Sequence, residues 1–139
     1  MSTDSLITWH ADASPIAGRR VLVHAFTGFL DAGGATATAA KLLQASEPRL
    51  LATVDIDQVL DYRARRPVLT FVTDHFAAVD MPQIALHEVR DGGGTPFLLL
   101  TGPEPDYQWQ RFSGAVLDIV RRTGVELTVG LSAVPWPAP

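Results

Sequence analysis

Cysteine is absent from this chain of 139 residues, which also has no long apolar run and no net positive charge. Without cysteine there is no disulfide framework, thiolate metal site or cysteine nucleophile. The sequence contains no run of eighteen apolar residues, so it predicts no membrane span. A net charge of −4 argues against a nucleic-acid groove, which needs a basic stripe. Residues 1–17 lack a basic segment followed by an apolar stretch, so we expect no signal peptide and a cytoplasmic protein.

The composition that is present indicates a folded domain. Apolar residues make up 47% of the chain and charged residues 19%, which is typical of globular rather than disordered proteins. A domain of this length buries about 70% of its unfolded surface. We therefore expect residues 1–139 to form one α/β domain, with a proline-rich tail at 135–139.

The first half alternates apolar runs with turn signals. Residues 6–9 suit a short edge strand, and 21–26 and 50–56 suit buried strands. Between the latter two, Asp31 is a candidate N-cap for a helix of small residues from 32 to about 45. Strand, helix and strand with short links predict a right-handed parallel βαβ unit.

The second half predicts more strands than helices. After an apolar run at 68–72, residues 74–83 read as irregular. Three further runs suit strands, and they lie at 84–89, 96–100 and 125–131, the first two joined by a glycine-rich hairpin turn at 91–94. Asp106 is a candidate cap for a helix over 107–122, which ends before Gly124. Five apolar residues share one face of that helix: Trp109, Phe112, Val116, Ile119 and Val120.

The spacing of Gly28 and Gly33, after a strand and before a helix, imitates a phosphate-binding loop. Such a loop needs Lys and then Ser or Thr to reach the phosphates and magnesium. Gly34 and Ala35 occupy those positions, and Asp31 adds a negative charge. The segment therefore favours a tight turn over nucleotide binding.

Other polar residues give weak signals for chemistry. The four histidines, His10, His24, His75 and His87, include no pair with the spacing of helical metal ligands. No serine stands in a nucleophile-elbow motif. Asp55, Asp57 and Asp61 follow a strand end, where α/β proteins bind ligands, although solvated charge is the favoured interpretation. We predict no catalytic, cofactor-binding or metal-binding residue.

One charged turn combines an aromatic side chain with guanidinium groups, and it comprises Tyr62, Arg63, Arg65 and Arg66. Tyrosine and arginine are enriched at protein interfaces. An exposed basic turn that balances nearby aspartates explains the pattern equally well, so both interpretations stay open.

Three longer segments, in this order and with these gaps, resemble the actinobacterial branch of the proteasome-assembly-chaperone-2 family. They are Phe26-x-Gly28-x-x-Asp31-Ala32-Gly33-x-Ala35, Asp61-Tyr62-Arg63-x-Arg65-Arg66-Pro67 and Leu100-x-Gly102-Pro103-Glu104-Pro105-Asp106-x-x-Trp109. The resemblance runs from about residue 20 to about residue 134. The positions that carry its structural motif are Gly28, Asp31, Gly33, Gly102, Pro103, Glu104, Asp106 and Trp109.

The resemblance implies a three-layer α/β/α sandwich similar to purine nucleoside phosphorylases, with a mixed, mostly parallel sheet, assembled into oligomers. It also implies a non-enzymatic assembly factor or interaction protein with protein partners and no cofactor. The alternative is a small-molecule-binding or ATP-dependent carboxylate–amine ligase-like enzyme, with its site at the carboxyl ends of the strands.

The family pattern is longer than this chain. Members continue after the strand at 125–131 into a Pro-His-Thr-Arg-Pro-like segment and a further half, whereas Pro135 is followed here by Trp136. Two helices are too few to cover both faces of a mostly parallel sheet. We therefore expect one open apolar sheet face, which a partner chain covers in a homo-oligomer.

Overall fold

The computed structural model describes residues 5–14 and 21–137, and its centre is a six-stranded sheet. In spatial order the strands are β1 (Ile7–Trp9), β3 (Arg49–Val54), β6 (Ala85–Arg90), β7 (Pro96–Pro103), β2 (Val21–Thr27) and β8 (Leu127–Leu131). Strand β2 runs parallel to both β7 and β8. The pairs β1–β3, β3–β6 and β6–β7 are antiparallel. Strands β2, β3, β7 and β8 therefore point the same way, which gives a mixed sheet.

The two strands of the expected βαβ unit run in the same direction, but they are not neighbours in the sheet. Strands β2 and β3 are parallel, yet β6 and β7 lie between them. The helix that connects them is α1 (Ala35–Leu43), which follows a 3₁₀ turn at Ala32–Gly34. A second 3₁₀ turn, Ile56–Gln58, follows β3. The hairpin predicted around residues 91–94 is confirmed as the β6–β7 connection.

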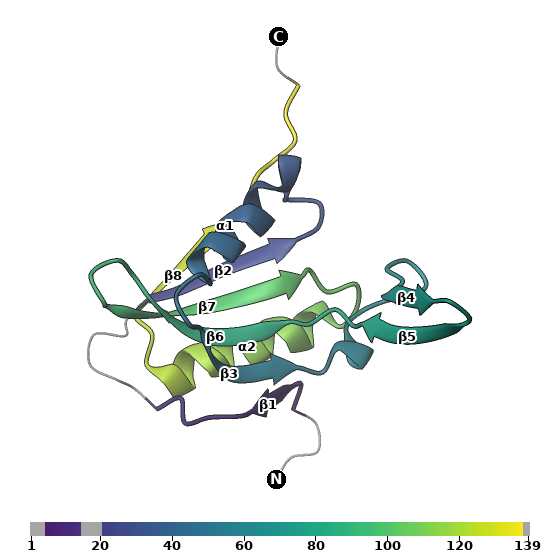
Figure 1. Cartoon of the computed structure of the whole chain (residues 1–139). Coiled ribbons are helices and arrows are strands. Elements are labelled where there is room, and N and C mark those ends of the chain that lie inside the picture. Colours follow the sequence, from purple (N-terminus) through teal and green to yellow (C-terminus); the bar gives the residue numbers. More distant parts are fainter. Residues whose placement is uncertain (1–4, 15–20, 138–139) are drawn as a thin grey trace.

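Each face of the sheet carries one helix. Helix α1 contacts β2 and β7, whereas α2 (Trp109–Thr123) packs on the other face, as Figure 1 shows. We expected one face to be left open, and the structure instead places a short helix on one face and a long helix on the other. Of the helices in the described part of the chain, none has the length and apolar character needed to cross a bilayer.

The main core lies between the sheet and α2. Leu22, Leu98 and Leu100 are buried there against Phe112 and Ile119 of the helix. Side chains alternate between the two faces along a strand. Accordingly Ala25, Ala85 and Leu99 are buried but lie outside this cluster, toward α1. Trp109 was expected on the core face of α2, and that expectation is wrong because its side chain is 56% exposed.

A second, two-stranded sheet stands apart from the first. Strand β4 (Val68–Val72) pairs antiparallel with β5 (His75–Asp80), so the prediction of irregular structure at 74–83 is wrong. We refer to residues 68–80 as the hairpin arm. Figure 1 shows this arm projecting past the end of the six-stranded sheet.

The two predicted helix caps have different outcomes. The Asp31 carboxylate reaches over the 3₁₀ turn and accepts the backbone N–H groups of Thr36 at 2.6 Å and Ala37 at 3.3 Å, in the first turn of α1. The capping role of Asp31 is therefore confirmed. Asp106 makes no such bond, because its carboxylate faces another loop and Gln108 takes the N-cap position of α2.

Candidate functional site

The three motif segments meet at the carboxyl end of β2 and β7. The two strands run side by side to their last residues, with Phe26 opposite Gly102. Beyond them, the Glu104 backbone N–H donates to the Thr27 carbonyl at 2.8 Å. The middle segment joins because the Asp61 N–H donates to the Asp106 carboxylate at 2.7 Å. Segments far apart in sequence therefore build one surface.

Arg65 holds this surface together electrostatically. Its guanidinium lies 3.1 Å from Oδ1 of Asp106 and 3.8 Å from Oε1 of Glu104. The three side chains are only 21–30% exposed. Arg65 was predicted as an interface residue. In the structure its guanidinium instead pairs with two carboxylates of the same chain. Arg63 and Arg66 of the same turn are exposed.

At two positions of the motif, Gly28 and Gly102, neighbouring atoms lie too close to leave room for a Cβ. A Cβ on Gly28 would overlap the Glu104 carboxyl group, which accepts the neighbouring Phe29 N–H at 3.1 Å. A Cβ on Gly102 would lie 2.6 Å from the carbonyl oxygen of Gln83. Both glycines also have positive φ, 151° and 147°, which side chains disfavour.

The basic turn is held by tyrosine–carboxylate contacts. The Tyr62 hydroxyl donates to Asp57, and this bond raises the pKa of Tyr62 to about 12. The Asp61 carboxylate accepts the Arg63 backbone N–H at 2.9 Å. That bond, and a further one from the Tyr107 hydroxyl, lower the pKa of Asp61, while the pKa of Tyr107 is raised. The turn that carries the predicted interface residues is therefore a structured element.

The possible carboxylate cluster at 55–61 does not converge on a common point. Asp55 accepts the side-chain amide of Gln58 at 2.7 Å, whereas Asp57 and Asp61 accept the different donors named above. Over residues 5–14 and 21–137, no three histidine or carboxylate side chains are grouped for a metal ion. The residues present therefore favour local hydrogen bonding over ligand chelation.

A pocket of about 350 Å³, here called the strand-end pocket, opens beside Glu104. Its walls come from His24 and Phe26 of β2 and from Trp109 and Phe112 of α2. Phe26 and Phe112 meet edge to face, with ring centroids 5.6 Å apart. The pocket lies at the carboxyl ends of parallel strands, the usual ligand position in α/β folds. Sequence reasoning gave His24 no functional role and missed its place in this wall.

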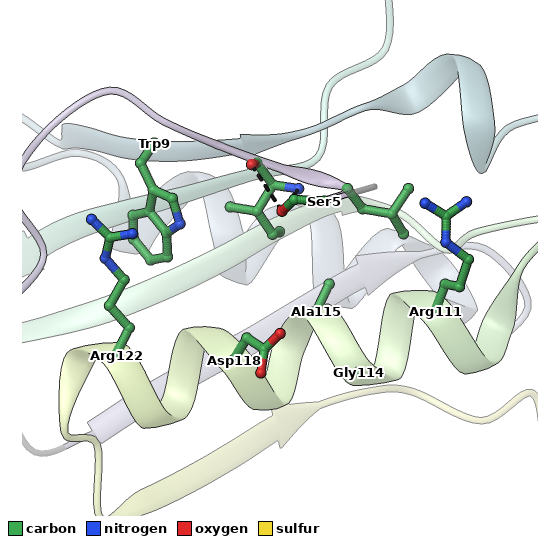
Figure 2. Close-up of a pocket in the computed structure, with 9 residues that line it drawn as sticks. Ser5, Trp9, Arg111, Gly114, Ala115, Asp118 and Arg122 are labelled. Atoms are coloured by element: carbon green, nitrogen blue, oxygen red, sulfur yellow. Dashed lines mark hydrogen bonds between the residues drawn. The ribbon is translucent and has the colours of Figure 1, made fainter. Parts of the chain in front are cut away.

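A larger groove of about 500 Å³ runs between β1 and α2. Figure 2 shows Trp9 and Arg122 facing each other across it, and the guanidinium carbon lies 4.3 Å from the indole centroid. Arg111 donates to the side chain of Gln58 at 2.9 Å, and Asp118 pairs with Arg121 at 3.3 Å. The strand-end pocket is the stronger candidate, because it has several aromatic walls and lies at the carboxyl ends of parallel strands.

The model of the PAC2 family matches residues 25–138. The chain belongs to the PAC2 family. This confirms the resemblance predicted from the three motifs, which now prove to be neighbours in space. No curated protein matches the sequence.

Solved structures of actinobacterial proteins show the same fold. A Mycobacterium tuberculosis protein of unknown function is 45% identical, with a TM-score of 0.82 over 94% of this chain and 46% of its own. A protein of unknown function from Corynebacterium glutamicum is 39% identical, with a TM-score of 0.89 over 98% of this chain and 52% of its own. A proteasome-assembly chaperone homologue from M. tuberculosis is 27% identical, with a TM-score of 0.77 over 86% of this chain and 51% of its own. The PAC2 chain therefore spans about half the length of these relatives.

Proposed function

We propose that this PAC2 chain is a non-enzymatic assembly factor that acts by associating with other protein chains, beginning with copies of itself. The hairpin arm is the observation that carries the proposal. The likeness to a proteasome-assembly chaperone homologue supports the same class of function. A cytoplasmic location remains a prediction from the sequence, and a sandwich similar to purine nucleoside phosphorylases remains a prediction of the family resemblance.

The hairpin arm exposes an unusual amount of apolar surface. Six large apolar side chains on its two strands are 45–67% exposed: Val68, Leu69, Phe71, Val72, Phe76 and Val79. A two-stranded hairpin alone in water is marginally stable. Exposed apolar patches mark interaction sites in proteins that are otherwise folded. An apolar arm of this kind gains stability when a partner surface covers it.

Both faces of the arm are apolar, which explains why its own chain does not cover it. Val68 and Val72 lie on one face of β4, and Leu69 and Phe71 on the other, because side chains alternate along a strand. Packing against one surface would leave the other face in water. Insertion between surfaces of an oligomer covers both. A second copy is the first partner we propose, since the family resemblance implies oligomers.

Exposed charges flank this arm. Arg63 and Arg66 are exposed in the turn that precedes β4, so they remain interface candidates. Tyr62 and Arg65 contribute indirectly, by fixing the turn through Asp57 and Asp106. Charged residues at the rim of an interface act on association rate and partner choice more than on affinity.

The test replaces Phe71 and Phe76, whose rings pack edge to face 5.1 Å apart, by serine. Light scattering coupled to size exclusion measures the mass of the wild-type chain and of this double variant. We expect a wild-type oligomer and a dissociated variant with unchanged secondary structure. A matched control replaces Leu42 and Leu117, exposed on the two helices, by serine and should remain oligomeric. A wild-type monomer at high micromolar concentration would contradict the proposal.

The ligase-like alternative meets an obstacle at the loop between β2 and α1. A helix N-terminus attracts phosphate through its free N–H groups. Here the Asp31 carboxylate already accepts the N–H groups of Thr36 and Ala37. We therefore expect no heat of binding when the chain is titrated with magnesium ATP. Micromolar binding that disappears in Gly33→Ala would favour the enzyme instead.

A further inference from the structure

We propose that the strand-end pocket binds a small planar aromatic cation. This inference is independent of the hairpin arm, because no residue of the arm lines the pocket. The volume of about 350 Å³ falls within the range of about 300–1,000 Å³ that is typical of small-molecule sites. That volume suits a molecule of one or two rings.

The walls of the pocket favour a flat ring. Phe26, Trp109 and Phe112 supply aromatic surfaces, and the His24 ring lies 5.9 Å from that of Phe26. Trp109 is the first residue of α2 and stays 56% exposed, so its indole is available to a ligand. Aromatic rings pair with other rings and attract cations over their faces.

The charge at the pocket mouth favours a cation. Glu104 lines the pocket, and Asp106 stands close behind it. Their common counter-ion is Arg65, which lies nearer to Asp106, at 3.1 Å, than to Glu104, at 3.8 Å. Two carboxylates therefore share one guanidinium, and Glu104 is the less neutralised of the two.

The contacts of Glu104 within the chain involve one of its two carboxylate oxygens. Its Oε1 accepts the Phe29 N–H at 3.1 Å and faces Arg65. Both of these contacts use Oε1, so Oε2 is left for a hydrogen-bond partner from outside the described residues. A ligand N–H group that carries positive charge would supply that partner in a charge-assisted hydrogen bond. The aromatic walls would then enclose the ring of the same molecule.

Benzamidine is the probe for this proposal, and benzoate is its anionic match of the same size. The three tryptophans give three indole N–H signals in a nitrogen-15 NMR spectrum, and Trp109→Phe assigns the signal of interest. We expect benzamidine to shift the Trp109 indole and leave those of Trp9 and Trp136 in place. Benzoate should leave all three in place.

Glu104→Gln keeps the side-chain shape and an acceptor for Phe29 but removes the charge. We expect it to weaken benzamidine binding about tenfold. Asp118→Asn is the control, because this exposed carboxylate lies on α2 outside the strand-end pocket. Equal binding by Glu104→Gln and the wild-type chain, or benzoate binding as tight as benzamidine, would overturn the proposal.

A blocking variant tests the location separately. Ser113→Phe adds a ring inside the pocket, whereas Gln110→Phe adds the same ring to an exposed position of α2 outside it. We expect Ser113→Phe alone to abolish the Trp109 shift. The Phe71 and Phe76 double variant should retain it, so failure of the arm hypothesis and failure of this one are distinguishable. A Trp109 shift that persists in Ser113→Phe would place the ligand elsewhere and refute the assignment.

Discussion

Replacing Arg65 by methionine tests whether the three motif segments form one structural unit. The substitution keeps much of the apolar stem and removes the charge. It leaves Glu104 and Asp106 as neighbouring carboxylates without their shared counter-ion. Asp106 would still accept the Asp61 N–H, so the backbone connection between the segments remains.

The size of the effect follows from the burial of the three groups. Exposed ion pairs contribute about 0.2–1 kcal/mol, whereas removing one partner of a buried pair costs about 3–5 kcal/mol. Side chains that are 21–30% exposed lie between these limits. We expect Arg65→Met to reduce the free energy of unfolding by about 2 kcal/mol. For a chain of this length that lowers the melting temperature by about 8 °C.

Thermal unfolding followed by circular dichroism measures this loss. Arg66→Met is the matched control, because Arg66 is exposed in the same turn and should change the melting temperature little. Asp106→Asn should also destabilise, which separates the ion-pair role from a helix cap, where asparagine would be nearly neutral. High salt should narrow the difference between wild type and Arg65→Met.

A double-mutant cycle makes the Arg65 hypothesis refutable. If Arg65 and Asp106 interact, the double variant Arg65→Met, Asp106→Asn should lose less free energy of unfolding than the two single variants lose together. Additive effects would show that the 3.1 Å contact contributes nothing in solution. An Arg65→Met melting temperature equal to that of Arg66→Met would refute the reasoning as a whole.

Further predictions concern the cap of α1, the half-buried His87 and a glycine in close contact with backbone atoms. Asp31→Ala should cost about 1 kcal/mol in chemical denaturation and Asp31→Asn much less, because asparagine can still cap α1. Burial lowers the pKa of His87, so the unfolded chain takes up a proton more readily than the folded chain. The free energy of unfolding should therefore fall as the pH drops below 6.5. In His87→Leu the free energy of unfolding should depend less on pH in this range. Gly102→Ala should destabilise by more than about 2 kcal/mol, since its Cβ meets backbone atoms. Gly92→Ala, which meets open space, should have little effect, and similar losses in both variants would contradict the close-packing argument.

Local patterns in the sequence predicted most of the elements. The apolar run at 21–26 became β2, the glycine cluster at 91–94 became a hairpin turn, and the periodic run after residue 107 became α2. Each of these signals lies within a few neighbouring residues. The order of strands in the sheet was not predictable in the same way, because pairing joins residues that are distant along the chain.

The candidate site was hidden for the same reason. Glu104 and Phe29 are 75 residues apart and share a hydrogen bond, and Arg65 joins them from a third segment. Asp106 looked like a helix cap because it precedes a periodic apolar pattern. Its carboxylate instead satisfies the Asp61 N–H and Arg65, partners that only the folded chain brings close.

Protection of the hairpin arm from hydrogen exchange tests the central claim most directly. The amide groups of β4 and β5 should exchange fast in dilute protein, since an uncovered two-stranded hairpin opens readily. As the protein concentration rises and copies associate, exchange in residues 68–80 should slow, while the central strands β2 and β7 stay protected throughout. Fast exchange of the arm at every concentration, in a chain that is otherwise protected, would contradict association through the arm.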